Sequence, residues 1–264
     1  MNNEMIRVLG SISPYCKDES NCPGYMYYDN EGKILLDCGF GVSRLIKMPD
    51  DLNNLTIVIS HLHKDHYSDL FALAYASYVY HNMGMLDTKI NVYIPEMLPW
   101  EDGYDDFNMI INNKDSFFNI ITYNKDSVIK IGNKEISFCE NHHSIKSFST
   151  KIKTNDSTIV YTGDMGFETN KEFSNFSQNA DLLICESTYV DSDNKVDENH
   201  LHAREAGMLA DMSNVKTLML THFWPEHDRL DYVNEASEVF PNVLAAKEGT
   251  ILNLSELKND VIRR

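Results

Sequence analysis

Short apolar runs rich in β-branched residues recur along the chain, separated by turns that contain glycine, proline and asparagine. Runs of this length and composition are typical of β-strands, and TIVIS at 56–60 has the character of a buried strand. Three longer stretches predict helices. The predicted strands are residues 5–9, 25–28, 34–37, 56–60, 90–94, 128–131, 135–140, 148–153, 158–161, 182–185 and 217–220, and the predicted helices are 69–82, 203–212 and 232–239.

Strands predominate in both halves of the chain, and helices follow the strands of each half. This order predicts two β-sheets packed together with helices outside, an αββα sandwich of the α/β (α+β) class. The acidic segment 101–106 predicts a loop or a short helix. No repeat, low-complexity tract or linker interrupts the pattern, so we expect a single domain over residues 1–264.

The composition narrows the location and the partners of the protein. A net charge of −17 argues against an extended nucleic-acid footprint and against anionic membrane surfaces, because both favour basic faces. No stretch approaches the length of a membrane span, and the N-terminal residues lack a signal-peptide pattern. The five cysteines are odd in number and include no CxxC pair, as is typical of free thiols in a reducing compartment. We therefore expect a cytoplasmic protein without a membrane partner, and a homodimer is compatible with the sequence.

The strongest chemical feature is the run SHLHKDH, which begins at the end of the predicted strand 56–60. It places His61, His63, Asp65 and His66 within six residues. Imidazole nitrogen and carboxylate oxygen are good ligands for zinc, and for iron or manganese with less preference. The alternative is a solvated loop with incidental histidines. We disfavour it because the chain has ten histidines in 264 residues and three of them gather here.

This run resembles the signature of the metallo-β-lactamase superfamily, and similar motifs of that family follow in order. His143 lies in HHSIKSF, Asp164 in VYTGDMG and His222 in LMLTHF, and each follows a predicted strand. The resemblance extends from VLGS near the N-terminus to EGTILNL near the C-terminus. It implies the metallo-β-lactamase fold, with two mixed β-sheets flanked by helices.

The resemblance also implies two divalent metal ions, with zinc favoured and manganese or iron as alternatives. A hydroxide that bridges two such ions is a nucleophile at neutral pH, and Asp65 is expected to orient it. Asp164 stands where lactam-cleaving members carry cysteine, which argues against a lactamase. By the resemblance, the first ion takes His61, His63 and His143, the second takes Asp65, His66 and His222, and Asp164 bridges them.

Two adjacent histidines compete for one ligand position. Successive residues of a strand point to opposite faces, so only one of His142 and His143 is expected to face the metals. The spacing of the motif favours His143, which leaves His142 beside the site or in solvent.

A second pair of motifs resembles the ribonuclease Z branch of the superfamily. Glu186 lies in LICESTY and His200 in NHLHAREA. By this resemblance the two form a proton-donating couple in which a protonated His200 serves the leaving alkoxide. Cys185 stands in place of the histidine that precedes the glutamate in that family, and Leu201 and His202 stand in place of Ser-Thr, so the match is incomplete. For His202 a place in the polar start of a helix is an equal alternative.

Three residues near these motifs are candidates for supporting roles. Asp37 ends a predicted strand that faces the site in this fold. His227 follows the last histidine motif closely and is either a surface residue or part of the pocket lining. Trp224 could form an apolar wall with its neighbour Phe223, although aromatic residues near a core more often simply pack.

One spacing separates this chain from ribonuclease Z itself. In that family a long insertion that clamps tRNA lies between the third-motif histidine and the bridging aspartate. Here Asp164 follows His143 by 21 residues, enough for two strands and a turn. We therefore expect an armless relative that acts on a small-molecule or short nucleotide phosphodiester. The alternatives are a carboxyl ester or lactone hydrolase, ribonuclease Z-type RNA processing, and a non-catalytic metal-binding protein.

Overall fold

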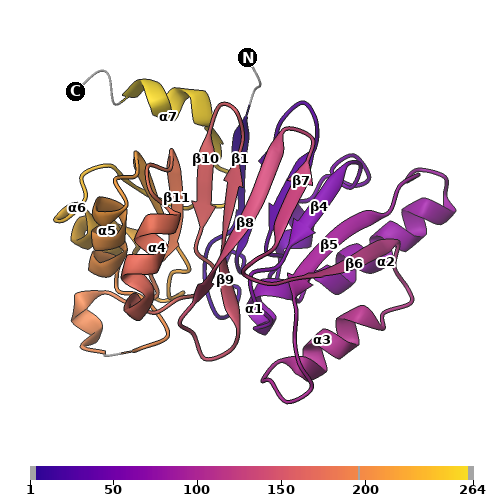
Figure 1. Cartoon of the computed structure of the whole chain (residues 1–264), viewed down its shortest axis with the longest axis horizontal. Coiled ribbons are helices and arrows are strands. Elements are labelled where there is room, and N and C mark those ends of the chain that lie inside the picture. The colour runs from indigo at the N-terminus through magenta and orange to yellow at the C-terminus, as the bar shows by residue number, and fades with distance from the viewer. Residues whose placement is uncertain (1–3, 196, 261–264) are drawn as a thin grey trace.

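The computed structural model describes residues 4–195 and 197–260 and shows two seven-stranded β-sheets packed together (Figure 1). In the first sheet the strand order is β14-β1-β2-β3-β4-β5-β6. Strands β14, β1, β2 and β3 pair antiparallel, and β3 to β6 pair parallel. The strands are β1 Met5–Gly10, β2 Gly24–Tyr28, β3 Lys33–Leu36, β4 Leu55–Val58, β5 Ile90–Pro95, β6 Phe118–Tyr123 and β14 Ile251–Asn253.

The second sheet repeats this plan with strands from the other half of the chain. Its order is β13-β12-β11-β10-β9-β8-β7, antiparallel from β7 to β10 and parallel from β10 to β13. Both sheets are therefore mixed. The strands are β7 Val128–Ile131, β8 Lys134–Asn141, β9 Ser147–Lys153, β10 Thr158–Tyr161, β11 Leu182–Glu186, β12 Thr217–Thr221 and β13 Val243–Ala245.

Helices cover the outer sides of the sandwich, α2 and α3 beside the first sheet and α4 to α6 beside the second (Figure 1). This arrangement confirms the predicted αββα sandwich. None of the helices in the described part of the chain is long and apolar enough to cross a membrane. The helices are α1 Lys64–Tyr67, α2 Leu70–Asn82, α3 Tyr104–Ile111, α4 Asn170–Phe176, α5 Ala203–Met212, α6 Arg229–Ser237 and α7 Leu254–Asp260, with 3₁₀ turns at η1 Val42–Leu45, η2 Phe167–Thr169 and η3 Asp191–Asp193.

The alternation of side chains along the strands divides the apolar residues between two cores. In β3, Ile34 and Leu36 are buried in the core that also holds Phe148 of the second sheet. The intervening Leu35 packs on the opposite face, in the core that holds Leu73 of α2. Because strand residues alternate between faces, an uninterrupted apolar strand fills both cores.

A buried ion pair also joins the two sheets. Lys134, the first residue of β8, is 1% exposed, and its Nζ lies 2.7 Å from Oδ2 of Asp29, just after β2. The backbone N–H groups of Glu31 and Gly32 also donate to Asp29. Burial opposes ionisation of Asp29, but the Lys134 ammonium and these amides outweigh it and hold the pKa of the carboxyl below its ordinary value.

The structure differs from the predicted elements in several places. The strand predicted at 56–60 is β4 Leu55–Val58, and the helix predicted at 232–239 is α6 Arg229–Ser237, whose start is set by Asp228 accepting the N–H of Leu230. The segment 101–106 contains the start of α3, which runs on to Ile111. Helices and strands without a counterpart among the predictions are α1, β6, β13, β14, α4 and α7.

Candidate metal centre

The seven predicted metal ligands lie just beyond strand ends, where the two sheets meet at one edge of the sandwich. His61 and His63 follow β4, and Asp65 and His66 lie in the short helix α1. The other three come from the second sheet and follow β8, β10 and β12; they are His143, Asp164 and His222. Polar residues that follow strands distant in the sequence thus lie close together at this edge of the sandwich.

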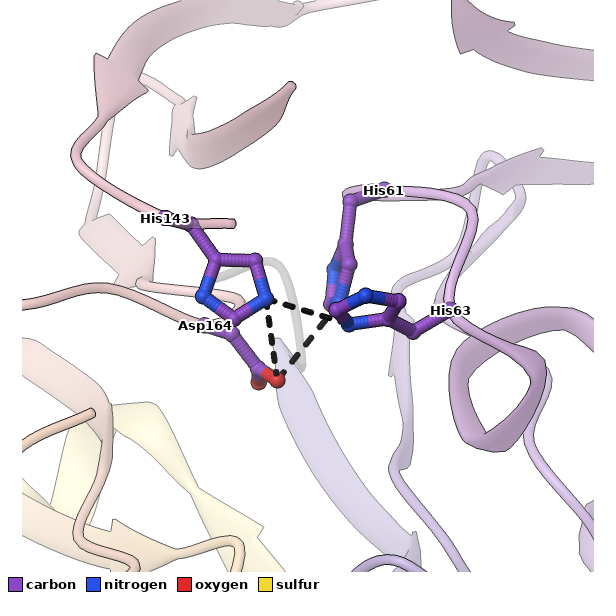
Figure 2. A group of neighbouring side chains, drawn as sticks. All are labelled: His61, His63, His143 and Asp164. Atoms are coloured by element: carbon purple, nitrogen blue, oxygen red, sulfur yellow. Dashed lines mark hydrogen bonds and ion pairs between the residues drawn. The ribbon is translucent and has the colours of Figure 1, made fainter. Parts of the chain in front are cut away.

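His61, His63, His143 and Asp164 form the first group (Figure 2). Nδ1 of His63 lies 3.1 Å from Nε2 of His61 and 3.1 Å from Nε2 of His143. Oδ2 of Asp164 lies 3.5 Å from Nε2 of His61 and 3.9 Å from Nε2 of His143. Two nitrogens that bind one zinc ion tetrahedrally lie about 3.3 Å apart. The spacing therefore fits a shared metal ion.

Asp65, His66 and His222 form the second group. Nε2 of His66 and Nε2 of His222 lie 3.3 Å apart. Oδ2 of Asp65 lies 3.4 Å from the first and 3.6 Å from the second. A carboxylate and two imidazoles again converge on one point.

Asp164 belongs to both groups through its two oxygens. Oδ2 faces the first group, while Oδ1 lies 3.2 Å from Nε2 of His66 and 3.1 Å from Nε2 of His222. Oδ1 is buried and has no hydrogen-bond partner in the described structure. A buried carboxylate oxygen without a donor is costly, and a cation there would satisfy it. The donor set thus fits two metal ions bridged by one carboxylate.

The histidines of the two groups have pKa values shifted in opposite directions. Burial lowers the pKa of His61, and it lowers the pKa of His63 to about 4, so both imidazoles are neutral and have lone pairs to offer. Burial also disfavours the charged form of His222, but Asp164 outweighs it and raises the pKa to about 10. Asp164 similarly raises the pKa of His66 against its burial.

The carboxyl group of Asp164 responds in the opposite direction. Burial opposes its ionisation, but His222 and His66 outweigh this effect, and the pKa of Asp164 lies well below its ordinary value. The carboxylate therefore stays ionised and available to bind cations.

The outer nitrogens of four of the histidines are held by fixed partners. Nδ1 of His143 lies 3.0 Å from the carbonyl oxygen of Asn199, and Nδ1 of His222 lies 2.9 Å from Oγ1 of Thr188. The other two contacts join Nδ1 of His61 to Oγ of Ser60 at 3.0 Å and Nδ1 of His66 to Oδ2 of Asp37 at 2.7 Å. Such contacts fix the ring orientation and leave the inner nitrogen free for a metal.

Asp37 organises the base of the site. Its buried carboxylate accepts hydrogen bonds from the backbone N–H of Ser60 at 2.6 Å, the Ser60 hydroxyl at 2.8 Å and the Tyr161 hydroxyl at 2.6 Å, and it contacts Nδ1 of His66. It thereby connects β3, β4 and β10 to one ligand. The sequence placed Asp37 facing the site, and the structure puts it there.

Unusual backbone geometry occurs where these strands end. Asp37 has φ 58° and His222 has φ 62°, the left-handed region that residues with a Cβ rarely adopt. Gly163, directly before Asp164, has φ 62° as well, and a Cβ at this position would lie 2.8 Å from Cβ of Ser60. Strained positions of this kind gather at functional sites, where the surrounding structure holds them.

Glu186 and His200 meet beside the two groups, as the second pair of motifs implied. Nδ1 of His200 lies 3.0 Å from Oε1 of Glu186, and the His200 ring stacks on that of His222 at 5.4 Å. Burial disfavours a charged His200, but Glu186 outweighs it and raises the pKa of the imidazole. Nε2 of His200 has no partner among the described residues.

Sequence reasoning did not assign Thr188 or Ser13 to the site. Thr188 Oγ1 donates to Glu186 and contacts Nδ1 of both His200 and His222, so one hydroxyl connects three functional side chains. The Ser13 hydroxyl donates to Oδ2 of Asp65 at 2.6 Å. Thr188 carries a weak signal, since it follows Glu186 by two residues in the same motif, whereas nothing near Ser13 indicates its partner.

Several other histidines lie outside the two groups. His142 turns away from the ligands and lies 3.7 Å from Glu168, so His143 is the member of the pair that faces the centre. His202 begins α5, where its backbone N–H donates to Glu205 in a capping box. His81, near the end of α2, stacks on Phe117.

Comparison with known proteins agrees with this geometry. Residues 33–223 match the family model described as the beta-lactamase superfamily domain. A probable metallo-hydrolase, YhfI of Bacillus subtilis, is 26% identical over 250 residues, covering 93% of this chain and 98% of its own length. Ribonuclease Z of Chlamydia trachomatis is 35% identical over 115 residues, which are 37% of either chain.

Solved structures show the same fold. The crystal structure of YhfI, a metallo-beta-lactamase fold protein, superposes with a TM-score of 0.83 at 24% identity and covers 96% of this chain and 99% of that one. The short form of human tRNase Z has a TM-score of 0.69 at 18% identity over 95% and 99% of the two chains. A diphosphatase of the PhnP family has a TM-score of 0.65 at 13% identity over 94% and 97%. The chain belongs to the beta-lactamase superfamily and has the metallo-β-lactamase fold.

Proposed function

We propose that this protein is a metal-dependent phosphodiesterase with a binuclear centre, for which zinc is the favoured metal. The observation that carries the proposal is the placement of Asp164, whose two carboxylate oxygens face two separate histidine groups. The related probable metallo-hydrolase supports the broader class of metal-dependent hydrolase.

The residues that would hold the metals are those of the two groups. His61, His63 and His143 would hold one ion, Asp65, His66 and His222 the other, and Asp164 both. When bound, two such ions lower the pKa of water to provide a nucleophile at neutral pH and neutralise charge on a phosphoryl group. Asp65 is held by Ser13 and directs its carboxylate into the centre, where it can orient the attacking water.

The proton needed by the leaving group is available on His200. Glu186 accepts from Nδ1 and favours the protonated imidazole, while Nε2 has no partner within residues 4–195 and 197–260. As water attacks phosphorus and the P–O bond to the leaving group breaks, the alkoxide would take the proton from Nε2, and the proton lost by the attacking water would restore the imidazolium. A phosphodiester needs this help because an alkoxide is a poor leaving group, so the Glu186–His200 pair supports this bond class.

The similar proteins support phosphorus chemistry. Ribonuclease Z, tRNase Z and the diphosphatase all bear names that denote cleavage of bonds to phosphorus. The segment between His143 and Asp164 is fully occupied by β9 and β10 and the turns around them, with no room for an inserted arm. A small or short phosphodiester therefore fits better than a tRNA precursor.

The test is turnover of bis-p-nitrophenyl phosphate by protein loaded with zinc, manganese or iron. We expect hydrolysis that Asp65→Ala abolishes. His200→Ala should slow the release of an alkoxide, as from adenosine 2′,3′-cyclic phosphate, by about 10²–10⁴-fold, the usual contribution of a general acid. It should affect bis-p-nitrophenyl phosphate much less, because p-nitrophenolate leaves without a proton. p-Nitrophenyl acetate and a simple lactone serve as the ester arm. Turnover of these esters, unaffected by His200→Ala and without phosphodiester hydrolysis, would assign the centre to ester chemistry; no turnover of any substrate would refute the enzyme.

A further inference from the structure

A pocket lies beside Tyr189, whose ring is 6.3 Å from that of His200. It has a volume of about 200 Å³ and is lined by Tyr189, Asp193, Lys195, Trp224 and His227. The residues come from the segments that follow β11 and β12, the two strands that also deliver Glu186 and His222. The pocket is therefore built on the same two strands as Glu186 and His222.

Two sets of contacts connect this pocket to the centre. The Tyr189 ring lies 6.3 Å from the His200 ring. On the other wall, the Tyr232 hydroxyl accepts from the backbone N–H of Trp224 and donates to the carbonyl of Thr188, whose side chain contacts His200 and His222. A group seated in the pocket is thus held at a fixed position relative to the proton donor.

Both walls are braced, so the pocket is preformed. Nε2 of His227 lies 3.3 Å from Oδ1 of Asp193 and joins the two segments across the pocket. Lys195 lies over the Tyr189 ring at 4.5 Å and donates to the Tyr189 hydroxyl at 2.7 Å. Preformed walls reduce the entropy that binding would otherwise cost.

The lining suits a planar heterocycle. Trp224 lines the pocket and is partly exposed, and its indole N–H has no acceptor in the described structure. The Lys195 ammonium has donors beyond the one given to Tyr189. Aromatic faces bind nucleobases by stacking, and edge donors pair with ring nitrogens and carbonyl oxygens. An aliphatic chain fits poorly, because it would desolvate Asp193, Lys195 and His227 without replacing their bonds to water.

We propose that this pocket, which we call the Trp224 pocket, receives the base of a nucleotide phosphodiester whose phosphate lies at the metal centre. The inference rests on the proposed phosphodiesterase function and narrows its substrate class. Trp224 supplies the stacking surface and Lys195 a donor to the base edge. Neither residue is part of the proton-donating pair, so they determine affinity for the base and leave bond cleavage to the centre.

The kinetic test compares two five-membered cyclic phosphodiesters, adenosine 2′,3′-cyclic phosphate and glycerol 1,2-cyclic phosphate, of which only the first carries a ribose ring and a base. In Trp224→Leu we expect KM for the nucleotide to rise about tenfold with kcat within about twofold, since one stacked base gives an effect of this order. KM for the glycerol compound stays unchanged. Trp224→Phe keeps an aromatic face and restores most of the nucleotide affinity.

A binding test needs no turnover. The chain has two tryptophans, so Trp100→Phe leaves Trp224 as the only indole fluorophore, and Trp100 is 79% exposed and outside the pocket. In this background, adenosine 5′-monophosphate should quench the Trp224 fluorescence at concentrations where ribose 5-phosphate does not. Trp224→Leu with Trp100 retained serves as the matched control and should show no saturable quenching.

The outcomes separate the two proposals. The base pocket is refuted if kcat/KM is equal for both cyclic phosphodiesters and unchanged by Trp224→Leu, and if adenosine 5′-monophosphate and ribose 5-phosphate change the fluorescence equally. The proposed phosphodiesterase function is not affected by that result. Saturable base-dependent quenching without hydrolysis of either compound by any metal-loaded form supports the pocket and refutes the phosphodiesterase. Circular dichroism and melting temperature confirm that each variant is folded.

Discussion

Replacing Asp37 by asparagine changes one charged atom at the base of the metal centre without changing the shape of the side chain. In the native structure Oδ1 of Asp37 accepts the N–H of Ser60, while Oδ2 faces the Ser60 hydroxyl, the Tyr161 hydroxyl and Nδ1 of His66. An asparagine has one oxygen for these donors. Whichever way the amide lies, its NH₂ group points at a group that donates.

The contacts set the size of the effect. If the amide oxygen stays toward His66, the backbone N–H of Ser60 loses its acceptor, and a buried unpaired donor costs about 1–3 kcal/mol of folding free energy. The charge that holds the His66 ring is lost in either orientation. Loss of such a partner weakens metal binding by about 10- to 100-fold. This corresponds to about 1.4–2.7 kcal/mol.

Competition with a chromophoric zinc chelator measures the affinity, and urea unfolding of metal-free protein measures the stability. Tyr161→Phe is the matched control, because it removes one hydroxyl from Asp37 but leaves the contact with His66. We expect it to cost about 1 kcal/mol of stability and to leave zinc affinity within about threefold. Zinc affinity of Asp37→Asn equal to that of the wild type would show that Asp37 does not position His66.

Three further predictions concern the backbone, the ion pair between the sheets and the metals. Gly163→Ala should lower the unfolding free energy by more than about 1 kcal/mol and weaken zinc binding, since the added Cβ meets Ser60 and the left-handed φ is strained; wild-type values for both would contradict this. Asp29→Asn should cost up to about 3–5 kcal/mol at pH 7 in urea unfolding, because it leaves the buried Lys134 with only the half-exposed Glu31 carboxylate, 3.6 Å away, and Lys134→Met should cost less, because Asp29 keeps its backbone donors. The pKa of Asp29 is lower in the folded protein than in the unfolded chain. Its contribution to the free energy of unfolding is therefore complete above the unfolded pKa of about 3.9 and is lost as the pH falls through the folded pKa. A difference in unfolding free energy between wild type and Asp29→Asn that stays constant below pH ~4 would be inconsistent with this. Removing metal with a chelator should lower the melting temperature in proportion to the logarithm of zinc concentration over its dissociation constant, and an unchanged melting temperature would mean that zinc does not bind the folded state.

The layers of the fold and the ligand groups could be predicted because their signals are local. Buried strands such as β4 are short apolar runs, and His61, His63, Asp65 and His66 follow one another within a single turn of chain. Each remaining ligand lies within three residues of a strand end, and the resemblance to the metallo-β-lactamase superfamily grouped these ligands with the first four.

Other features depend on contacts that no local pattern shows. Ser13 reaches Asp65 across 52 positions, and Tyr161 reaches Asp37 across 124. Strand β6 Phe118–Tyr123 was missed because it lies at the edge of its sheet with partly exposed side chains, which blurs the alternation. The start of α3 follows Gly103, whose left-handed φ the sequence alone does not reveal.

Each half of the chain contributes half of each metal group. The first sheet supplies His61 and His63 to one and Asp65 and His66 to the other, and the second sheet supplies His143, Asp164 and His222. Neither sheet alone provides all the ligands of either group, so the centre forms only after the two sheets have packed together. We therefore expect activity to appear late in folding, and the onset of turnover during refolding would report when the two sheets pack together.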